Sequence, residues 1–253
     1  MLYTLKRHPV PIEATLRDCL VLTYALPRET LEPLLPPGLS LDCFGDFGFL
    51  AIAVVQADHL RPAFLPPACG RSFVLAGYRI FTKFRTPQGR TLRGLFILRS
   101  DTNDRRMVTF GNLLTHYHYH LCASSLARSG KDLQINITTP DGFGDLFVRA
   151  NLRAEGFLPV HSPFKTARDA RRFAGPLPYT FDYEPQTNSI IVIKGVRPNW
   201  NPTLVAAEVS RCTFFDREPF HGARPVLASA FYVHDVPYRW ERGRRFSLKE
   251  VSS

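Results

Sequence analysis

Short segments rich in β-branched and aromatic residues recur along this chain, and most are bounded by Gly, Pro, Asn or Asp. Such segments are typical of β-strands, because their side chains suit a pleated, half-buried surface. Strands that do not alternate with long helices favour an antiparallel sheet or barrel over βαβ units. The predicted strands are Cys19–Ala25, Phe47–Gln56, Ser72–Thr86, Arg93–Arg99, Thr115–Cys122, Leu133–Thr139, Asp145–Ala154, Ser189–Val196, Leu204–Phe215 and Val226–Val236.

Turn and helix signals agree with this mainly β pattern. Pro87 and Gly89 stand where a turn needs a fixed and a positive φ, so the strands on either side are predicted to pair as a hairpin. Asp141-Gly142 supplies a second turn. The predicted helices are few and short: Arg28–Leu35, a stretch near Asp104–Leu113, and Lys165–Phe173.

The length and composition predict one domain over residues 1–253, because 45% hydrophobic residues can bury a sizeable core and no stretch reads as a linker. No apolar run approaches the ~20 residues that cross a bilayer, and the N-terminal segment has no signal-type apolar stretch. We therefore expect a cytoplasmic protein with no membrane partner. Homo-oligomerisation stays open.

The five cysteines are widely spaced, which favours buried, reduced thiols over disulfides or a metal site. The net charge of +10 raises the question of nucleic acid, since clustered cations bind phosphate by releasing counterions. Here the charge is scattered, and no helix-turn-helix, zinc-finger or RNA-binding signature accompanies it. We interpret the charge as a solvated basic surface and predict no nucleic-acid partner.

Several motifs carry a resemblance to a known family. An arginine-acid pair at 17–18 precedes a strand with a tyrosine at position 24, and a short helix then ends in a Leu-Leu-Pro-Pro-Gly-Leu sequence at 34–39. In this order and spacing, the chain resembles the acetoacetate decarboxylase superfamily. The motifs Gly77-Tyr78-Arg79 and Leu98-Arg99-Ser100-Asp101 and the aromatic stretch Leu114–His120 are similar to an uncharacterised branch described only as a domain of unknown function. The resemblance implies an antiparallel β-barrel or cone with a flanking sheet and a few short helices.

The resemblance also bears on chemistry, because the decarboxylase uses a Schiff-base lysine, a carboxylate-binding arginine and a nearby glutamate. By its spacing, Arg17 takes the place of that arginine. The glutamate falls at about Leu75 and the lysine near Tyr117, and the sequence has no lysine between Lys83 and Lys131. Imine formation needs a nucleophilic amine. The chain is therefore predicted not to be an acetoacetate decarboxylase.

The run from His116 to His120 alternates histidine and tyrosine. In a strand all three histidines would share one face. Imidazoles at this spacing can hold a divalent metal. The alternative, which we favour, is a polar and aromatic cavity wall, with Tyr117 and Tyr119 on the opposite face in the core or an interface. No metal and no cofactor are predicted.

Arg79 lies inside an apolar segment, where a charge is rare unless it is paired or lines a pocket. By alternation it shares a face with Leu75, Gly77 and Phe81. A guanidinium matches a carboxylate bidentately. The first hypothesis is an enzyme or binding protein for a small anionic keto, enol or carboxylate compound in the barrel; the alternative is a non-catalytic ligand sensor or interaction module. The predicted ligand-binding residues are Arg17, Arg79, His116, Tyr117 and His118.

Overall fold

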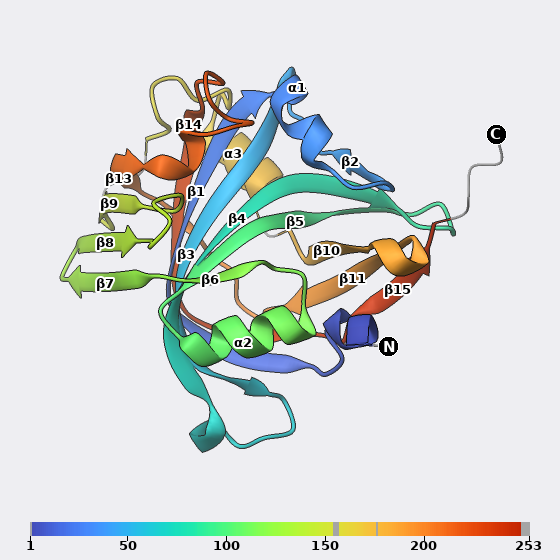
Figure 1. The fold of residues 1–253 in the computed structure, drawn as a ribbon. Coiled ribbons are helices and arrows are strands. Elements are labelled where there is room, and N and C mark those ends of the chain that lie inside the picture. Colours follow the sequence, from blue (N-terminus) through green and yellow to red (C-terminus); the bar gives the residue numbers. More distant parts are fainter. Residues whose placement is uncertain (1, 154–156, 176, 249–253) are drawn as a thin grey trace.

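The computed structural model describes residues 2–153, 157–175 and 177–248 and shows two β-sheets (Figure 1). The larger has 11 strands, with β2 (Leu39–Leu41) paired to β4 and β6 (Tyr119–Leu121) paired to β5. Its main path runs in the order β12 (Thr203–Leu204), β14 (Val226–Trp240), β1 (Ile12–Pro27), β3 (Phe47–Pro62), β4 (Arg71–Arg85), β5 (Thr91–Thr102), β10 (Tyr179–Glu184), β11 (Ser189–Val196) and β15 (Arg244–Ser247).

The larger sheet closes on itself, because β11 also pairs with β14 through Gly195 opposite Trp240 and Val196 opposite Arg239. The resulting ring of strands has an inner and an outer face, as predicted. It is not antiparallel throughout: β10 and β6 each pair with β5 in parallel. The prediction of an antiparallel sheet is thus corrected to a mixed sheet in which most pairings are antiparallel.

A second sheet of four strands flanks the ring, in the order β13 (Ala206–Cys212), β9 (Leu146–Asn151), β8 (Asp132–Thr138) and β7 (Ala123–Ser129). It stands to the left of the long strands in Figure 1. Its inward side chains, among them Ile135 and Val148, pack in one hydrophobic core with Leu20, Ile52 and Tyr78 from the outer face of the ring. Burial of apolar surface on both sheets therefore holds the flanking sheet against β1, β3 and β4.

Short helices occupy the ends of the ring. They are α1 (Arg28–Leu31), α2 (Arg105–Leu114) and α3 (Ala167–Ala174), with 3-10 turns at Leu2–Lys6, Glu32–Leu34, Pro67–Cys69, Pro185–Thr187 and Thr213–Phe215. On the inner face at one end, α3 packs through Phe173 against Phe49, Phe81 and Phe164. Asp104 caps α2 by accepting a hydrogen bond from the backbone N–H of Met107 at 2.9 Å.

Most of the predicted elements are confirmed with shifted ends. The Thr86–Arg90 turn joins β4 to β5, with Gly89 at a φ of 80°. The Asp141-Gly142 turn is also present, and Gly142 has a φ of 66°. The prediction of a strand over Thr115–Cys122 is wrong for its first half, because only Tyr119–Leu121 pairs, with β5. Within the described part of the chain, no helix is long and apolar enough to cross a bilayer.

Candidate functional site

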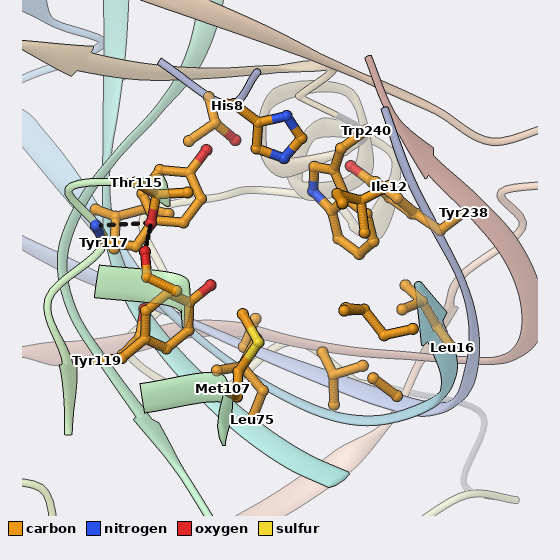
Figure 2. A pocket seen from close by; sticks show the side chains of 18 of the residues that line it. His8, Ile12, Leu16, Leu75, Met107, Thr115, Tyr117, Tyr119, Tyr238 and Trp240 are labelled. Atoms are coloured by element: carbon orange, nitrogen blue, oxygen red, sulfur yellow. Dashed lines mark hydrogen bonds between the residues drawn. The ribbon is translucent and has the colours of Figure 1, made fainter. Parts of the chain in front are cut away.

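The inner face of the ring encloses a cavity of about 470 Å³. Figure 2 shows side chains arranged around it, with Tyr117 and Tyr119 opposite Tyr238 and Trp240. Much of the wall is apolar and comes from long strands: Leu16 from β1, Val55 from β3, Leu75 from β4 and Ile97 from β5. Strand alternation therefore decides which side chains line the cavity, because every second side chain of a strand points inward.

β4 places Arg79 on this inner face, and Arg71 lines the cavity from the first position of the same strand. The neighbours of Arg79 on the face are Leu75 and Phe81, which also line the cavity, whereas Tyr78 and Ile80 point into the core with the flanking sheet. Among the described residues Arg79 has no ion pair or hydrogen-bond partner, and its Nε is buried without one. The predicted inward orientation of Arg79 is confirmed, while its role in binding stays a prediction.

Arg197 is a second cavity arginine, and sequence reasoning missed it. It follows β11 directly, donates from Nη1 to the Tyr238 hydroxyl at 3.3 Å and lies 4.4 Å from the centre of the Trp200 ring. Its Nη2 is buried without a partner. Burial lowers the pKa of Arg197, and the positive charge of Arg79 lowers it further. The two guanidinium groups are therefore close enough to repel each other.

The thiol of Cys19 is affected by the positive charges of both arginines. Burial raises the pKa of this thiol to about 11, and the charges of Arg79 and Arg197 reduce that rise. Cys19 projects from β1 into the same cavity. Among the described residues no salt bridge joins Arg79 or Arg197 to a carboxylate, so this part of the cavity carries uncompensated positive charge.

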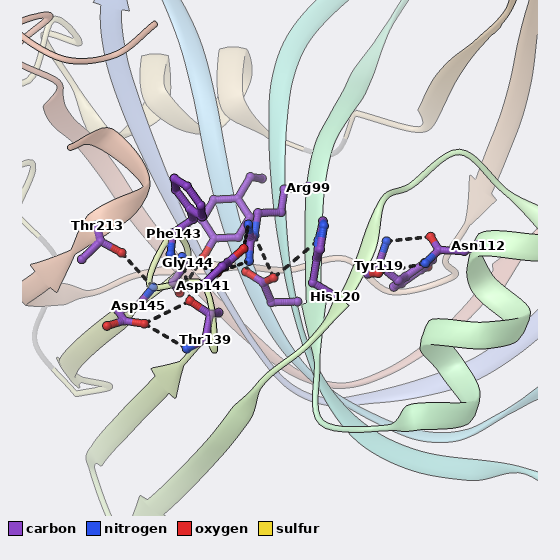
Figure 3. Close-up of polar contacts among 12 residues, drawn as sticks. Arg99, Asn112, Tyr119, His120, Thr139, Asp141, Phe143, Gly144, Asp145 and Thr213 are labelled. Carbon is purple, nitrogen blue, oxygen red and sulfur yellow. Dashed lines mark hydrogen bonds and ion pairs between the residues drawn. The ribbon is translucent and has the colours of Figure 1, made fainter. Parts of the chain in front are cut away.

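Tyr117 and Tyr119 supply hydroxyl groups on the opposite wall. Burial raises the pKa of both, so both are neutral donors at neutral pH. The Tyr117 hydroxyl is buried without a partner. Asn112 of α2 fixes the backbone of Tyr119, donating to its carbonyl and accepting from its N–H at 2.8 Å each (Figure 3). The positions that the resemblance gave to the glutamate and the lysine, Leu75 and Tyr117, thus both line the cavity.

The histidines of the 116–120 run do not line the cavity, so their prediction as wall residues is corrected. His116 pairs with Asp182, its Nδ1 lying 2.7 Å from the carboxylate, and His118 and His120 are exposed. Histidines and tyrosines do alternate, but the more apolar tyrosines take the buried side. No group of three or more His, Cys, Asp or Glu side chains in the described residues is arranged to hold a metal ion.

Arg17 also lies outside the cavity, contrary to its predicted place in the site. Its side chain is 51% exposed and forms ion pairs with Asp58 at 3.0 Å and Asp235 at 2.7 Å. The cause is a β-bulge: between Leu16 and Asp18 the pairing of β1 with β3 shifts register, so Arg17 is an extra residue. Leu16 and Cys19 face inward on either side of it.

His8 lines the cavity and was missed by sequence reasoning. It is 7% exposed, has a left-handed backbone with a φ of 53°, and its Nδ1 is buried without a partner. Burial lowers the pKa of its imidazole to about 4. His8 is therefore neutral at neutral pH and offers the cavity a polar ring that carries no charge.

Comparisons with known proteins bear on this fold and cavity. A family model described as "Uncharacterized conserved protein" matches residues 13–237. A search of curated protein sequences gives no match.

Solved structures with the same fold include an acetoacetate decarboxylase from Legionella pneumophila subsp. pneumophila str. Philadelphia 1, at 12% identity and a TM-score of 0.60, covering 94% of this chain and 88% of that one. An acetoacetate decarboxylase-like enzyme from Sphingomonas wittichii RW1 has 14% identity and a TM-score of 0.63, with 96% and 94% covered. The enduracididine biosynthesis enzyme MppR complexed with pyruvate has 13% identity and a TM-score of 0.59, with 94% and 91% covered. The predicted acetoacetate decarboxylase-like fold is confirmed.

Proposed function

The chain belongs to the DUF2071 family of uncharacterized conserved proteins, and we propose that it binds a small anionic compound, such as a keto or other carboxylic acid, inside the ring. The proposed contacts are Arg79 and Arg197 with the anion and Tyr117 as a neutral hydrogen-bond donor. Arg79 and Tyr117 belong to the set expected from sequence. Arg197 replaces the exposed Arg17.

One observation carries this proposal: two guanidinium groups face one cavity, and no carboxylate of the described residues pairs with either. A charge held away from water without a partner is unfavourable, and repulsion between two like charges adds to this. A ligand carboxylate between them would relieve both, since guanidinium forms bidentate, charge-assisted hydrogen bonds with it. The structural neighbour MppR is complexed with pyruvate, which supports a ligand of this class on this fold.

Calorimetric titration with pyruvate, acetoacetate and butyrate tests the proposal. We expect at least one carboxylate to bind, and Arg79→Met and Arg197→Met each to weaken binding about tenfold or more, because a hydrogen bond to a charged group contributes ~1.5–3 kcal/mol. Arg17→Met is the matched control and should leave binding unchanged, because Arg17 is outside the cavity. Equal losses from Arg17→Met and Arg79→Met would contradict the site.

The proposal excludes acetoacetate decarboxylase chemistry. No lysine is among the described residues that line the cavity, and Lys83 points instead toward Asp42, with 3.7 Å between Nζ and the carboxylate. Burial keeps the Cys19 thiol protonated, so it is not a nucleophile either. After incubation with acetoacetate and borohydride, mass spectrometry should find no reduced imine. A stoichiometric adduct on any lysine would overturn this part of the proposal.

The same cavity suits a binding protein or sensor that does no chemistry. The lack of an activated nucleophile among the described lining residues supports that alternative. Turnover separates the two: a ligand that raises the melting temperature and is recovered unchanged after prolonged incubation identifies a sensor, whereas loss of the ligand identifies an enzyme.

A further inference from the structure

The cavity is larger and more apolar than a three- or four-carbon keto acid requires. Its volume of about 470 Å³ lies in the ~300–1,000 Å³ range of pockets for drug-sized ligands. Hydrophobic side chains form its walls on several strands and after β11: Leu16, Val21, Val55, Leu75, Ile97, Trp200 and Trp240. A small acid held by the arginines would leave most of this apolar surface uncovered.

Two cationic side chains of the cavity, Arg79 and Arg197, have buried nitrogen atoms without a partner among the described residues. Arg79, Arg197 and Cys19 all line the cavity, and the charges of both arginines lower the pKa of the Cys19 thiol. The two charges therefore lie in the same part of the cavity. Of the other arginines that line the cavity, Arg61 pairs with Glu13 at 3.1 Å, Arg71 pairs with Asp104 at 2.5 Å, and Arg106 on α2 is exposed to solvent. The interior therefore offers one place for an anionic head and a separate apolar wall for the rest of a molecule.

The apolar wall continues to the surface along α2. Met107 and Phe110 of this helix line the cavity, and Phe110 is also 57% exposed. Leu113 on the same helix and Leu5 in the 3-10 turn that packs against it are further exposed hydrophobic residues. In Figure 1, α2 crosses the lower part of the ring. This helix thus borders both the cavity interior and solvent, as an entrance for an apolar chain would.

We propose that the ligand is an amphiphilic monocarboxylate with an alkyl or arylalkyl body of about ten carbons. Its carboxylate lies between Arg79 and Arg197, and its body runs along Leu75, Ile97 and Met107 toward α2. At about one water volume, ~30 Å³, per methylene, a ten-carbon chain takes up ~300 Å³ and fits the cavity. This inference rests on the anion site of the proposed function and adds the class of ligand that the apolar wall selects.

A chain-length series tests the inference on the wild-type protein. Butyrate, hexanoate, octanoate and decanoate are titrated below their micelle concentrations, with 1-decanol as the uncharged partner of decanoate. Affinity should rise about fourfold for each added methylene, the fold-change that corresponds to ~0.8 kcal/mol per buried CH₂. Decanol should bind at least tenfold more weakly than decanoate.

Two neighbouring positions on α2 provide matched variants. Met107 lines the cavity and Thr109 is exposed and does not. Met107→Trp should fill part of the apolar wall and lower decanoate affinity by tenfold or more while leaving butyrate unchanged. Thr109→Trp should change neither.

The outcomes separate the two proposals. Equal affinities from butyrate to decanoate would overturn the amphiphilic ligand and leave the small-anion site standing. Equal binding of decanol and decanoate, with Arg79→Met changing neither, would overturn the anion site as well.

Discussion

The guanidinium of Arg79 lies against Gly77, two residues earlier on the inner face of β4. A Cβ added at Gly77 would come within 2.7 Å of Nε and 2.8 Å of Nη2 of Arg79. Such distances are shorter than van der Waals contact, so only glycine lets the guanidinium lie back along its own strand. The position of the Arg79 charge therefore depends on the absence of a side chain at Gly77.

The first prediction concerns this pair. Gly77→Ala should displace the Arg79 guanidinium and weaken carboxylate binding by several-fold, while the free energy of unfolding changes by no more than ~1 kcal/mol, since the new methyl group meets the end of a flexible side chain. Calorimetry and urea unfolding on one preparation give both values. Unchanged affinity would show that Arg79 binds the anion from another conformation or not at all.

The second prediction is a trade-off between stability and binding. Because Arg79 and Arg197 repel each other and pair with no carboxylate of the described residues, Arg197→Met should stabilise the ligand-free protein by about 1 kcal/mol. At a saturating concentration of the carboxylate ligand, the wild type should be more stable than Arg197→Met, because the ligand binds and stabilises the wild type more strongly. Urea unfolding in a chloride buffer, with and without ligand, measures both. A variant less stable than wild type in the absence of ligand would contradict the repulsion.

The third prediction is a pH dependence due to His8. Its pKa is about 4 in the folded protein and 6.5 when unperturbed. Between these values the unfolded chain binds a proton that the folded protein does not, so His8 lowers stability as the pH falls from 6.5 to 4, by about 3 kcal/mol in all. His8→Asn keeps a residue that tolerates the left-handed backbone and removes the titration.

Asp101 acts in the opposite direction and has to be separated from His8. Burial raises its pKa from 3.8 to about 6, so the folded protein binds the extra proton and acidification over that range is stabilising. The quantity to measure is therefore the stability difference between wild type and His8→Asn at pH 7 and at pH 4.5. Relative to wild type, His8→Asn should be more stable at pH 4.5 than at pH 7. His59→Asn is the control, because His59 has the same left-handed backbone but an exposed side chain. A difference that does not vary with pH would contradict the role of His8.

Strand periodicity explains what the sequence predicted well. On β4, alternation put Arg79 on one face with Leu75 and Phe81, and the structure has this arrangement. Long strands, the two turns and three strands of the flanking sheet, β8, β9 and β13, leave regular local patterns and were also predicted, whereas β7 was not. That a sheet flanks the ring was implied by the family resemblance. That residues 1–253 form one domain stays a prediction.

The site residues that were misplaced depend on features without a local pattern. Arg17 points outward because of a bulge in the pairing of β1 with β3, and the bulge has no mark in the sequence near Leu16. Alternation at 116–120 was predicted, and Tyr117 and Tyr119 are buried as expected. Alternation does not show on which side the cavity lies, and it lies on the side of the tyrosines and not of the histidines. Arg197 enters the cavity through contacts with Trp200 and with the distant Tyr238. The only available signal was a basic residue directly after an apolar strand.

The last prediction concerns the link between the ring and the flanking sheet. Arg99 of β5 donates from Nε to Asp101 at 2.8 Å and from Nη1 and Nη2 to Asp141 at 2.8 and 3.0 Å (Figure 3). Asp101 is fully buried, whereas the Asp141 side chain is 35% exposed. Removing the guanidinium therefore leaves one buried carboxylate without its cation, and Asp141 can turn to water.

Arg99→Met should lower the free energy of unfolding by about 3–5 kcal/mol at pH 8, and Asp141→Asn by ~1 kcal/mol. Without Arg99 the pKa of Asp101 rises further, because the cation that lowers it is gone. Lowering the pH to 5 should thus restore much of the stability of Arg99→Met, and the double variant Arg99→Met/Asp101→Asn should be more stable at pH 8 than Arg99→Met alone. Urea unfolding of the four proteins at both pH values gives the comparison. If Arg99→Met loses the same stability at pH 5 and pH 8, and the second substitution recovers none of it, the loss comes from packing of the arginine stem and not from the buried charge of Asp101.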